Sequence, residues 1–231
     1  IDNPQRLRQL VALKEANPEL KVMLSVGGWG SGRFSEIAAD RDRRKAFAED
    51  CLRTVKEYGL DGIDIDWEYP TSSAAGISSS PEDTDNFTRL MKQLRITLGE
   101  ERLLTLASAA SAEYIDFKAI EPYVDFVNIM AYDMAVAPKH HSALYESGVS
   151  GGMTSDKAVK AHLDAGIPAG KLVLGMPFYG RGGSYFASFN DYKHIRTDSL
   201  TVEKWDPESM VPYIADKEGN QVVLTQTGQY F

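Results

Sequence analysis

Apolar residues along the chain follow two alternating patterns, which together predict an α/β fold. Short apolar runs typical of buried strands occur at 21–26, 60–66, 103–108, 124–130 and 171–176. Stretches with apolar residues at helical spacing occupy 2–16, 40–58, 79–98, 117–123 and 155–165. Continuously apolar strands joined by helices are typical of parallel sheets, so the choice lies between a doubly wound sheet and a closed (β/α)8 barrel.

Two features favour the barrel. A dinucleotide-binding sheet requires a glycine-rich phosphate turn that leads into a helix, and the segment 27–30 (Gly-Gly-Trp-Gly) lacks the required spacing. Ser25, Glu68, Tyr132 and Asp133 stand at the C-terminal ends of predicted strands, where barrel enzymes build their sites. We therefore predict a TIM-type barrel that is incomplete in this chain, because five strands are predicted and a barrel has eight.

The pattern changes after residue 176. Aromatic residues follow without a helical period, and the runs 211–214 and 221–225 flank a turn and predict a β-hairpin. We therefore assign residues 1–183 to the catalytic barrel portion and residues 184–231 to a small β-rich insertion.

Composition and charge exclude several classes of partner. The net charge of −8 argues against nucleic acid and anionic membranes. Cys51, the single cysteine, permits no internal disulfide and no thiolate cluster, and its helical setting predicts a packed core thiol. No apolar run approaches the roughly 20 residues that a membrane span needs. The four histidines lack zinc-site spacing, so we treat them as ordinary polar residues and expect no metal and no cofactor.

The segment 61–70 (DGIDIDWEYP) carries the strongest chemical signal. Asp64, Asp66 and Glu68 alternate with apolar residues, which places the three acids on one face of a strand, successive ones about 6.6 Å apart. Crowded carboxyl groups repel one another and lose hydration, so at least one is expected to hold a proton near neutral pH and to serve as a general acid. Asp61 lies an odd number of residues from the other three acids, so it would face the opposite side of the strand, and we interpret it as structural.

A solvated acidic loop or a calcium site is the alternative interpretation of these acids. A calcium loop contains a central glycine and little apolar matter. Ile63, Ile65 and Trp67 are instead residues that favour strands, so the pattern disfavours this alternative.

Four separated motifs resemble those of the glycoside hydrolase family 18 chitinases. They are Ser-Val-Gly-Gly at 25–28, Asp-x-x-Asp-x-Asp-x-Glu at 61–68, Met-Ala-Tyr-Asp at 130–133 and Met-Pro-Phe-Tyr-Gly-Arg at 176–181. The resemblance implies a (β/α)8 barrel in which the predicted strands are the third to the seventh. It also implies membership of the subgroup with a small insertion domain after the seventh strand.

The resemblance further implies retaining hydrolysis of the β-1,4 linkages of chitin or chito-oligosaccharides, in which the 2-acetamido oxygen of the substrate attacks the anomeric carbon. Glu68 would be the general acid and then the general base. Asp66 would bind the acetamido N–H, and Asp64 would share a proton with Asp66 with help from the Ser25 hydroxyl. Tyr132 would donate a hydrogen bond to the acetamido oxygen.

Substrate-binding residues are also implied by the resemblance. Trp29 would lie on the leaving-group side, Asp133 would bind a sugar hydroxyl and Met130 would pack beneath the ring. The expected substrate-binding set is Trp29, Ser25, Met130, Asp133, Tyr69, Met176 and Arg181. Arg181 could instead pair with a carboxylate of the insertion. Phe178, Tyr179 and Tyr185 are further aromatic candidates, and Trp67 is either such a platform or barrel–helix packing.

The expected partner is chitin or an N-acetylglucosamine oligosaccharide, bound by a monomer. A secreted or periplasmic location is expected, although this sequence contains no signal peptide. Two alternatives stay open: an endo-β-N-acetylglucosaminidase that acts on N-glycan cores, and a non-catalytic chitin-binding lectin of the same fold. The presence of Glu68 disfavours the lectin.

Overall fold

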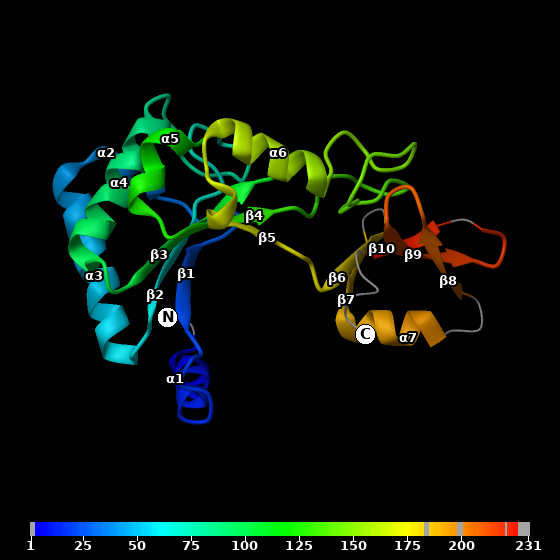
Figure 1. Ribbon diagram of the computed structural model, residues 1–231, viewed down its shortest axis with the longest axis horizontal. Helices are drawn as coiled ribbons and strands as arrows, with labels where there is room; N and C mark the ends of the chain where they lie inside the picture. The colour runs from blue at the N-terminus through cyan, green and yellow to red at the C-terminus, as the bar shows by residue number, and fades with distance from the viewer. Residues whose placement is uncertain (1–2, 183–184, 198–200, 220, 226–231) are drawn as a thin grey trace. The chain divides into compact units, whose positions relative to one another are not determined.

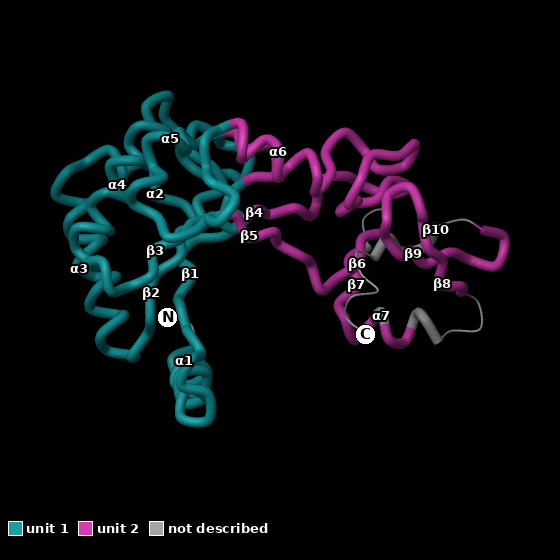
Figure 2. Tube along the Cα trace, in the orientation of Figure 1, with its two compact units in different colours: residues 1–108, 114–128, 165–171 teal, residues 109–113, 129–164, 172–231 magenta. Residues whose placement is uncertain are grey.

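The structure is a computed structural model that describes all residues except 1–2, 183–184, 198–200, 220 and 226–231. The chain divides into two compact units (Figure 2). Unit 1 comprises residues 1–108, 114–128 and 165–171, and unit 2 comprises residues 109–113, 129–164 and 172–231. The boundary predicted between residues 183 and 184 stays a prediction.

A five-stranded sheet has the strand order β1-β2-β3-β4-β5 (Figure 1). Its strands are β1 (Met23–Gly27), β2 (Gly62–Asp66), β3 (Leu103–Ala109), β4 (Phe126–Met130) and β5 (Leu172–Leu174). The pairs β1–β2 and β2–β3 are parallel, as the pattern of apolar runs predicted. The fifth strand is shorter than the predicted 171–176.

The helices of unit 1 follow the predicted order, with one addition. They are α1 (Pro4–Ala12), α2 (Phe34–Ala39), α3 (Arg41–Tyr58), α4 (Asp83–Leu98) and α5 (Phe117–Ile120), with short 3₁₀ turns at Leu13–Glu15, Glu121–Tyr123 and Ala169–Lys171. Figure 1 shows α2, α3 and α4 gathered beside β2 and β3. The sequence analysis missed α2, and it placed the start of α4 at residues 79–80, although the helix begins at Asp83.

Helix α3 shows how local chemistry sets the ends of an element. The Asp40 side chain accepts a hydrogen bond from the Arg43 N–H at 2.8 Å and caps the first turn. Gly59 ends the helix with a φ of 68°, a left-handed conformation that glycine adopts at low cost. Cys51 is buried on the inner side of this helix, and burial followed by the charge of Asp50 raises the pKa of its thiol to about 12.

Trp67 lies in the core between α2 and α4. Its ring is 1% exposed, stacks on Phe34 at a centroid distance of 5.5 Å and meets the edge of Phe87 at 5.5 Å. Ile63 and Ile65, on the same side of the strand, are fully buried. Trp67 is therefore packing between the sheet and its helices, which decides between the two roles considered for it.

Unit 2 contains α6 (Ser155–Ala165) and a second sheet of order β7-β6-β10-β9-β8. The strands are β6 (Tyr179–Gly182), β7 (Tyr185–Ser188), β8 (Thr201–Asp206), β9 (Val211–Asp216) and β10 (Gln221–Thr225). The antiparallel pairing of β9 with β10 confirms the predicted hairpin. The absence of helical structure after residue 176 was a wrong prediction, since α7 spans Phe189–Thr197.

Two negative findings apply to the part of the chain that the structure describes. None of its helices combines the length and the apolar character that crossing a membrane requires. Within the same ranges, no three His, Cys, Asp or Glu side chains gather so that they could hold a metal ion.

Gly27 and Gly62 allow the sheet strands to approach one another, and alanine at either position should be destabilising. A Cβ at Gly27, where φ is 132°, would lie 1.9 Å from the Asp66 carbonyl oxygen. A Cβ at Gly62 would lie 2.1 Å from the Leu103 carbonyl oxygen. We expect each alanine variant to lower the free energy of unfolding by about 3 kcal/mol or more, measured by urea denaturation.

Gly76→Ala is the matched control for backbone conformation. Gly76 has a φ of 74°, but a Cβ there meets nothing within 4 Å. Gly76→Ala should therefore lower the free energy of unfolding by about 1–2 kcal/mol, which is the cost of a left-handed conformation for alanine. Equal losses at Gly27, Gly62 and Gly76 would show that close strand approach is not the constraint.

Candidate active site

The acids of β2 lie on the side of the strand away from the packed helices. Ile63, Ile65 and Trp67 are buried, whereas Asp64, Asp66 and Glu68 are partly exposed. This alternation is what a pleated strand produces, and Glu68 continues it two residues beyond Asp66, the last residue of β2.

Asp64 is held by three neutral donors from other strands of the sheet, two from the adjacent β1 and β3 and one from β4. Its Oδ2 accepts a hydrogen bond from the Ser25 hydroxyl at 2.7 Å. Its Oδ1 accepts hydrogen bonds from the Thr105 hydroxyl at 2.6 Å and from the Asn128 amide at 3.1 Å. Ser25 and Thr105 are the register partners of Asp64, so their side chains share its face of the sheet.

Thr105 and Asn128 were not recognised in the sequence. Each is a polar residue in an otherwise apolar strand, and that was the available signal. Which acid they would meet depends on strand register, which a single sequence does not give.

Asp66 is the acid with the most perturbed titration. Burial raises the pKa of its carboxyl to about 7, and the charges of Glu68 and Asp64 add to that rise. Its Oδ1 is buried and has no hydrogen-bond partner among the described residues. Asp66 is therefore divided between its neutral and charged forms near neutral pH, and it retains a free acceptor position.

Aromatic side chains surround the segment that follows the acids. The Tyr69 ring stacks on Tyr114 at a centroid distance of 5.0 Å and meets Trp29 edge-on at 6.4 Å. Burial raises the pKa of the Tyr69 hydroxyl, and the charge of Glu68 raises it further, so the phenol stays neutral. Trp29 is 64% exposed, which leaves an apolar face available to a ligand. Tyr114 was missed in the sequence.

Asp133 in unit 2 has an opposite electrostatic environment. Its Oδ1 accepts from Arg181 Nε and its Oδ2 from Arg181 Nη2, both at 2.8 Å, in a bidentate pair. Burial acts to raise the pKa of Asp133, but hydrogen bonds from His141, Arg181 and Tyr179 outweigh it and hold the pKa far below its usual range. Arg181 therefore pairs with Asp133, and no ion pair joins it to a carboxylate in the part of 184–231 that the structure describes.

Tyr179 is the centre of an aromatic group around this pair. Its ring lies 6.2 Å from Tyr132, stacks on His141 at 5.4 Å and stacks on Phe186 at 4.7 Å. Met176 and Phe178 are exposed, and Met130 is half-buried. The side chain of Tyr185 lies outside the described residues. The functions predicted for Tyr132, Met130 and Met176 stay predictions.

Most of the histidines lie inside unit 2. His140 is 1% exposed and its Nε2 lies 2.9 Å from Asp206, His141 is 1% exposed beside Asp133, and His162 is fully buried with its Nδ1 2.7 Å from the Ala158 carbonyl oxygen. Only His194 is exposed. Three of the four are thus buried residues of unit 2 that form internal hydrogen bonds.

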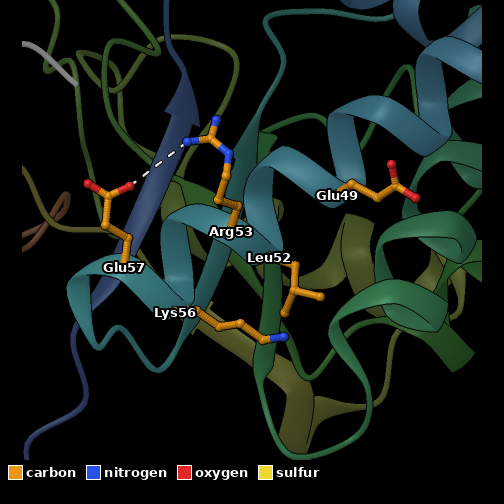
Figure 3. A pocket seen from close by; sticks show the side chains of 5 residues that line it. All are labelled: Glu49, Leu52, Arg53, Lys56 and Glu57. Carbon is orange, nitrogen blue, oxygen red and sulfur yellow. Dashed lines mark ion pairs between the residues drawn. The ribbon is translucent and has the colours of Figure 1, made fainter.

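A cavity on the outer side of α3 is not part of this chemistry (Figure 3). It measures about 540 Å³ and is lined by Glu49, Leu52, Arg53, Lys56 and Glu57. Arg53 pairs with Glu57 at 3.9 Å. These are long side chains of a solvated helix face, and none of the acids of β2 lines the cavity.

The order of these residues along the chain matches a known family. Residues 1–227 fit the family model described as "Glycosyl hydrolases family 18". The chain belongs to that family. The resemblance inferred from the four motifs is confirmed, and so is the fold class, a (β/α) TIM-type barrel of which this family 18 chain supplies five strands.

Relatives and solved structures of the family are similar over nearly the whole chain. It is 39% identical to "Chitinase A1" of Niallia circulans across 94% of this chain and 34% of the relative. It matches the family 18 N-acetylglucosaminidase of Paenibacillus barengoltzii with a TM-score of 0.87 at 35% identity, across 96% of this chain and 75% of that one. It matches an Ostrinia furnacalis Group IV chitinase in complex with allosamidin with a TM-score of 0.85 at 30% identity, across 96% and 70%. The chain spans 34% to 59% of the length of three curated relatives that it matches.

The raised pKa of Asp66 predicts a pH-dependent difference in stability between the wild type and Asp66→Asn. A carboxyl whose pKa is higher in the folded state contributes stability that is complete below its unfolded pKa and is lost as the pH rises through about 7. From pH 5 to pH 8 the wild type should therefore lose about 1–2 kcal/mol relative to the variant, after allowance for solvent screening. Thermal unfolding followed by circular dichroism measures this difference.

Asp61→Asn is the control for that experiment. Burial acts to raise the pKa of Asp61, but the Val22 N–H and Lys14 outweigh it and lower the pKa. The stability that the Asp61 carboxylate contributes is therefore complete above pH 5. The difference in stability between the wild type and Asp61→Asn should stay constant from pH 5 to pH 8. A flat difference for Asp66→Asn as well would contradict the raised pKa of Asp66.

Proposed function

We propose that this chain is the catalytic part of a chitinase, which hydrolyses β-1,4 linkages between N-acetylglucosamine units. The observation that carries the proposal is the state of Asp66. It is a carboxyl with a pKa of about 7 and a free acceptor oxygen, and it lies between a fully hydrogen-bonded Asp64 and the terminal acid Glu68. The relatives named as chitinases support the same activity.

The proposed reaction begins with proton transfer from Glu68 to the glycosidic oxygen, so that the leaving sugar departs as an alcohol. The 2-acetamido oxygen of the substrate attacks the anomeric carbon with inversion as the leaving sugar departs, and a cyclic oxazolinium ion forms. The later attack of water inverts the same carbon again, so the overall reaction retains its configuration. Glu68, now charged, removes a proton from the water that opens the ring. The proton that Glu68 gave leaves with the departing sugar, and the proton taken from water restores the acid form of Glu68.

Asp66 would stabilise the intermediate through its acceptor oxygen. The buried Oδ1 can accept the acetamido N–H, which becomes more acidic as the ring closes. Three donors fix Asp64 behind it, so the negative charge of Asp64 stays close to the positive charge that develops.

Sugar rings have apolar faces, and Trp29 and Tyr69 offer aromatic surface in unit 1. By the family resemblance, Asp133, Arg181, Met130 and Met176 would bind the sugar and Tyr132 would bind the acetamido oxygen. A monomeric state and a secreted or periplasmic location are proposed on the same basis.

The decisive test of the catalytic acid is Glu68→Gln in the intact protein. The amide preserves shape but cannot donate a proton to an oxygen leaving group, so kcat should fall by about 10³-fold or more. Turnover of 4-nitrophenyl chitobioside measures kcat, and calorimetric titration with a chitin tetramer should show binding retained. Near-normal turnover would remove Glu68 from the mechanism, and retained binding with an inactive wild type would indicate the lectin.

The second candidate is a different cleavage specificity with the same acids, and the name of the Paenibacillus N-acetylglucosaminidase supports keeping it. Product release should be compared for a chitin hexamer and for a high-mannose glycoprotein. We expect kcat/KM at least about 10²-fold higher for the hexamer, because aromatic platforms bind successive apolar sugar faces. A preference for the glycoprotein would indicate the endo-β-N-acetylglucosaminidase.

A further inference from the structure

Three residues within three positions of Glu68 along the chain are held in place by contacts that lead to the first turns of helix α4. They are Trp67, Tyr69 and Thr71. Trp67, immediately before Glu68, is wedged between Phe34 of α2 and Phe87 of α4. It is 1% exposed, so its backbone position follows from the packing of these two helices.

Tyr69, immediately after Glu68, is held indirectly. Its ring lies nearly parallel to that of Tyr114, with an interplanar angle of 10°. The Thr84 hydroxyl of α4 donates a hydrogen bond of 2.9 Å to the Tyr114 carbonyl oxygen. Tyr114 has a φ of 72°, an unfavourable conformation for a non-glycine residue, and this hydrogen bond holds the segment in it.

Thr71, three residues after Glu68, is held by Asp83, the first residue of α4. The Asp83 side chain is fully buried. Its Oδ2 accepts hydrogen bonds from the Thr71 N–H at 3.2 Å and from the Ser80 N–H at 2.7 Å, and its Oδ1 accepts from the Ser35 hydroxyl at 2.7 Å. Thr71 has a φ of 63°, which a β-branched residue adopts only when its surroundings impose it.

A buried carboxylate without a cation is unusual, because burial penalises the charge. Asp83 offsets this cost with its three donors and with its position at the positive end of the α4 dipole. Its bonds join α2, the loop after Glu68 and the start of α4 at one point. Simple helix capping requires only the bond from Ser80. The bond from Thr71 instead fixes the loop after Glu68, and the bond from Ser35 joins α2 to the same carboxylate.

We propose that Asp83 is a positioning residue for the reaction, which fixes Glu68 by anchoring Thr71 on one side while Phe34 and Phe87 anchor Trp67 on the other. This inference rests on the proposed function. Glu68 must meet a glycosidic oxygen within hydrogen-bond reach, and a misplacement of about 1 Å can cost about 10²-fold in rate. Asp83 does not contact the substrate in this proposal; it acts through the backbone that carries the acid.

The test compares Asp83→Ala with Asp83→Asn in the intact protein. Alanine leaves the Thr71 and Ser80 N–H groups without their acceptor. Asparagine keeps an oxygen for both, and its amide can donate to the Ser35 hydroxyl oxygen, so it restores the anchor without the charge. With 4-nitrophenyl chitobioside, alanine should lower kcat about 10²-fold with KM changed less than about threefold, and asparagine should recover at least about a tenth of wild-type kcat.

Asp61→Ala is the matched structural control. Asp61 also joins elements through a backbone N–H, that of Val22 at 2.7 Å, but it precedes β2 at the opposite end from Glu68. Its variant should lower the melting temperature and leave kcat per folded molecule unchanged. The inference is overturned if Asp83→Ala keeps kcat within about threefold, or if Asp61→Ala loses as much kcat as Asp83→Ala.

A crystal structure of Asp83→Ala separates this inference from the proposed function. If the wild type does not turn over the chitobioside, the proposed function fails, but the positions of Thr71 and Glu68 still decide the anchoring. Displacement of both relative to Trp67 supports Asp83 as their anchor. If both remain at their wild-type positions, Asp83 is structural only.

Discussion

The repulsion among carboxyl groups on one face of β2 is the constraint on which the rest of the structure depends. Asp64, Asp66 and Glu68 crowd together, and the surroundings of Asp64 and Asp66 differ in a way that lets the strand tolerate them. Asp64 is satisfied by three neutral donors, and Asp66 binds a proton more strongly than a free carboxyl does. This crowding lowers the free energy of unfolding when the acids are ionised, and it favours a bound proton on Asp66 near neutral pH.

Close strand approach makes this arrangement possible. Gly28 donates its N–H to the Asp66 carbonyl oxygen at 2.8 Å, and any side chain at Gly27 would collide with that oxygen. Gly27, the last residue of β1, is therefore a steric requirement of the acid strand. The absence of a side chain at Gly27 lets the backbone of β1 approach the backbone of Asp66, so close backbone packing explains this glycine.

The sequence predicted the parallel strands, the helix ends with clear capping residues and the face occupied by the acids, because these follow from local pattern. It did not predict the partners of those acids. Thr105 and Asn128 meet Asp64 through strand register, and Tyr114 meets Tyr69 through a loop. Such contacts depend on tertiary positions, which no period in a single sequence encodes.

Asp66 and Asp133 have the same side chain but opposite titration behaviour. Burial without a cation raises the pKa of Asp66, whereas the bidentate pair with Arg181 holds the pKa of Asp133 far down. Near neutral pH the first exchanges protons and the second is a fixed anion. Different environments give identical side chains different pKa values, and these values decide which side chain transfers protons and which one binds as a fixed charge. The Asp133–Arg181 pair therefore suits hydrogen bonding to neutral hydroxyl groups, and the proton chemistry that we propose depends on the acids of β2.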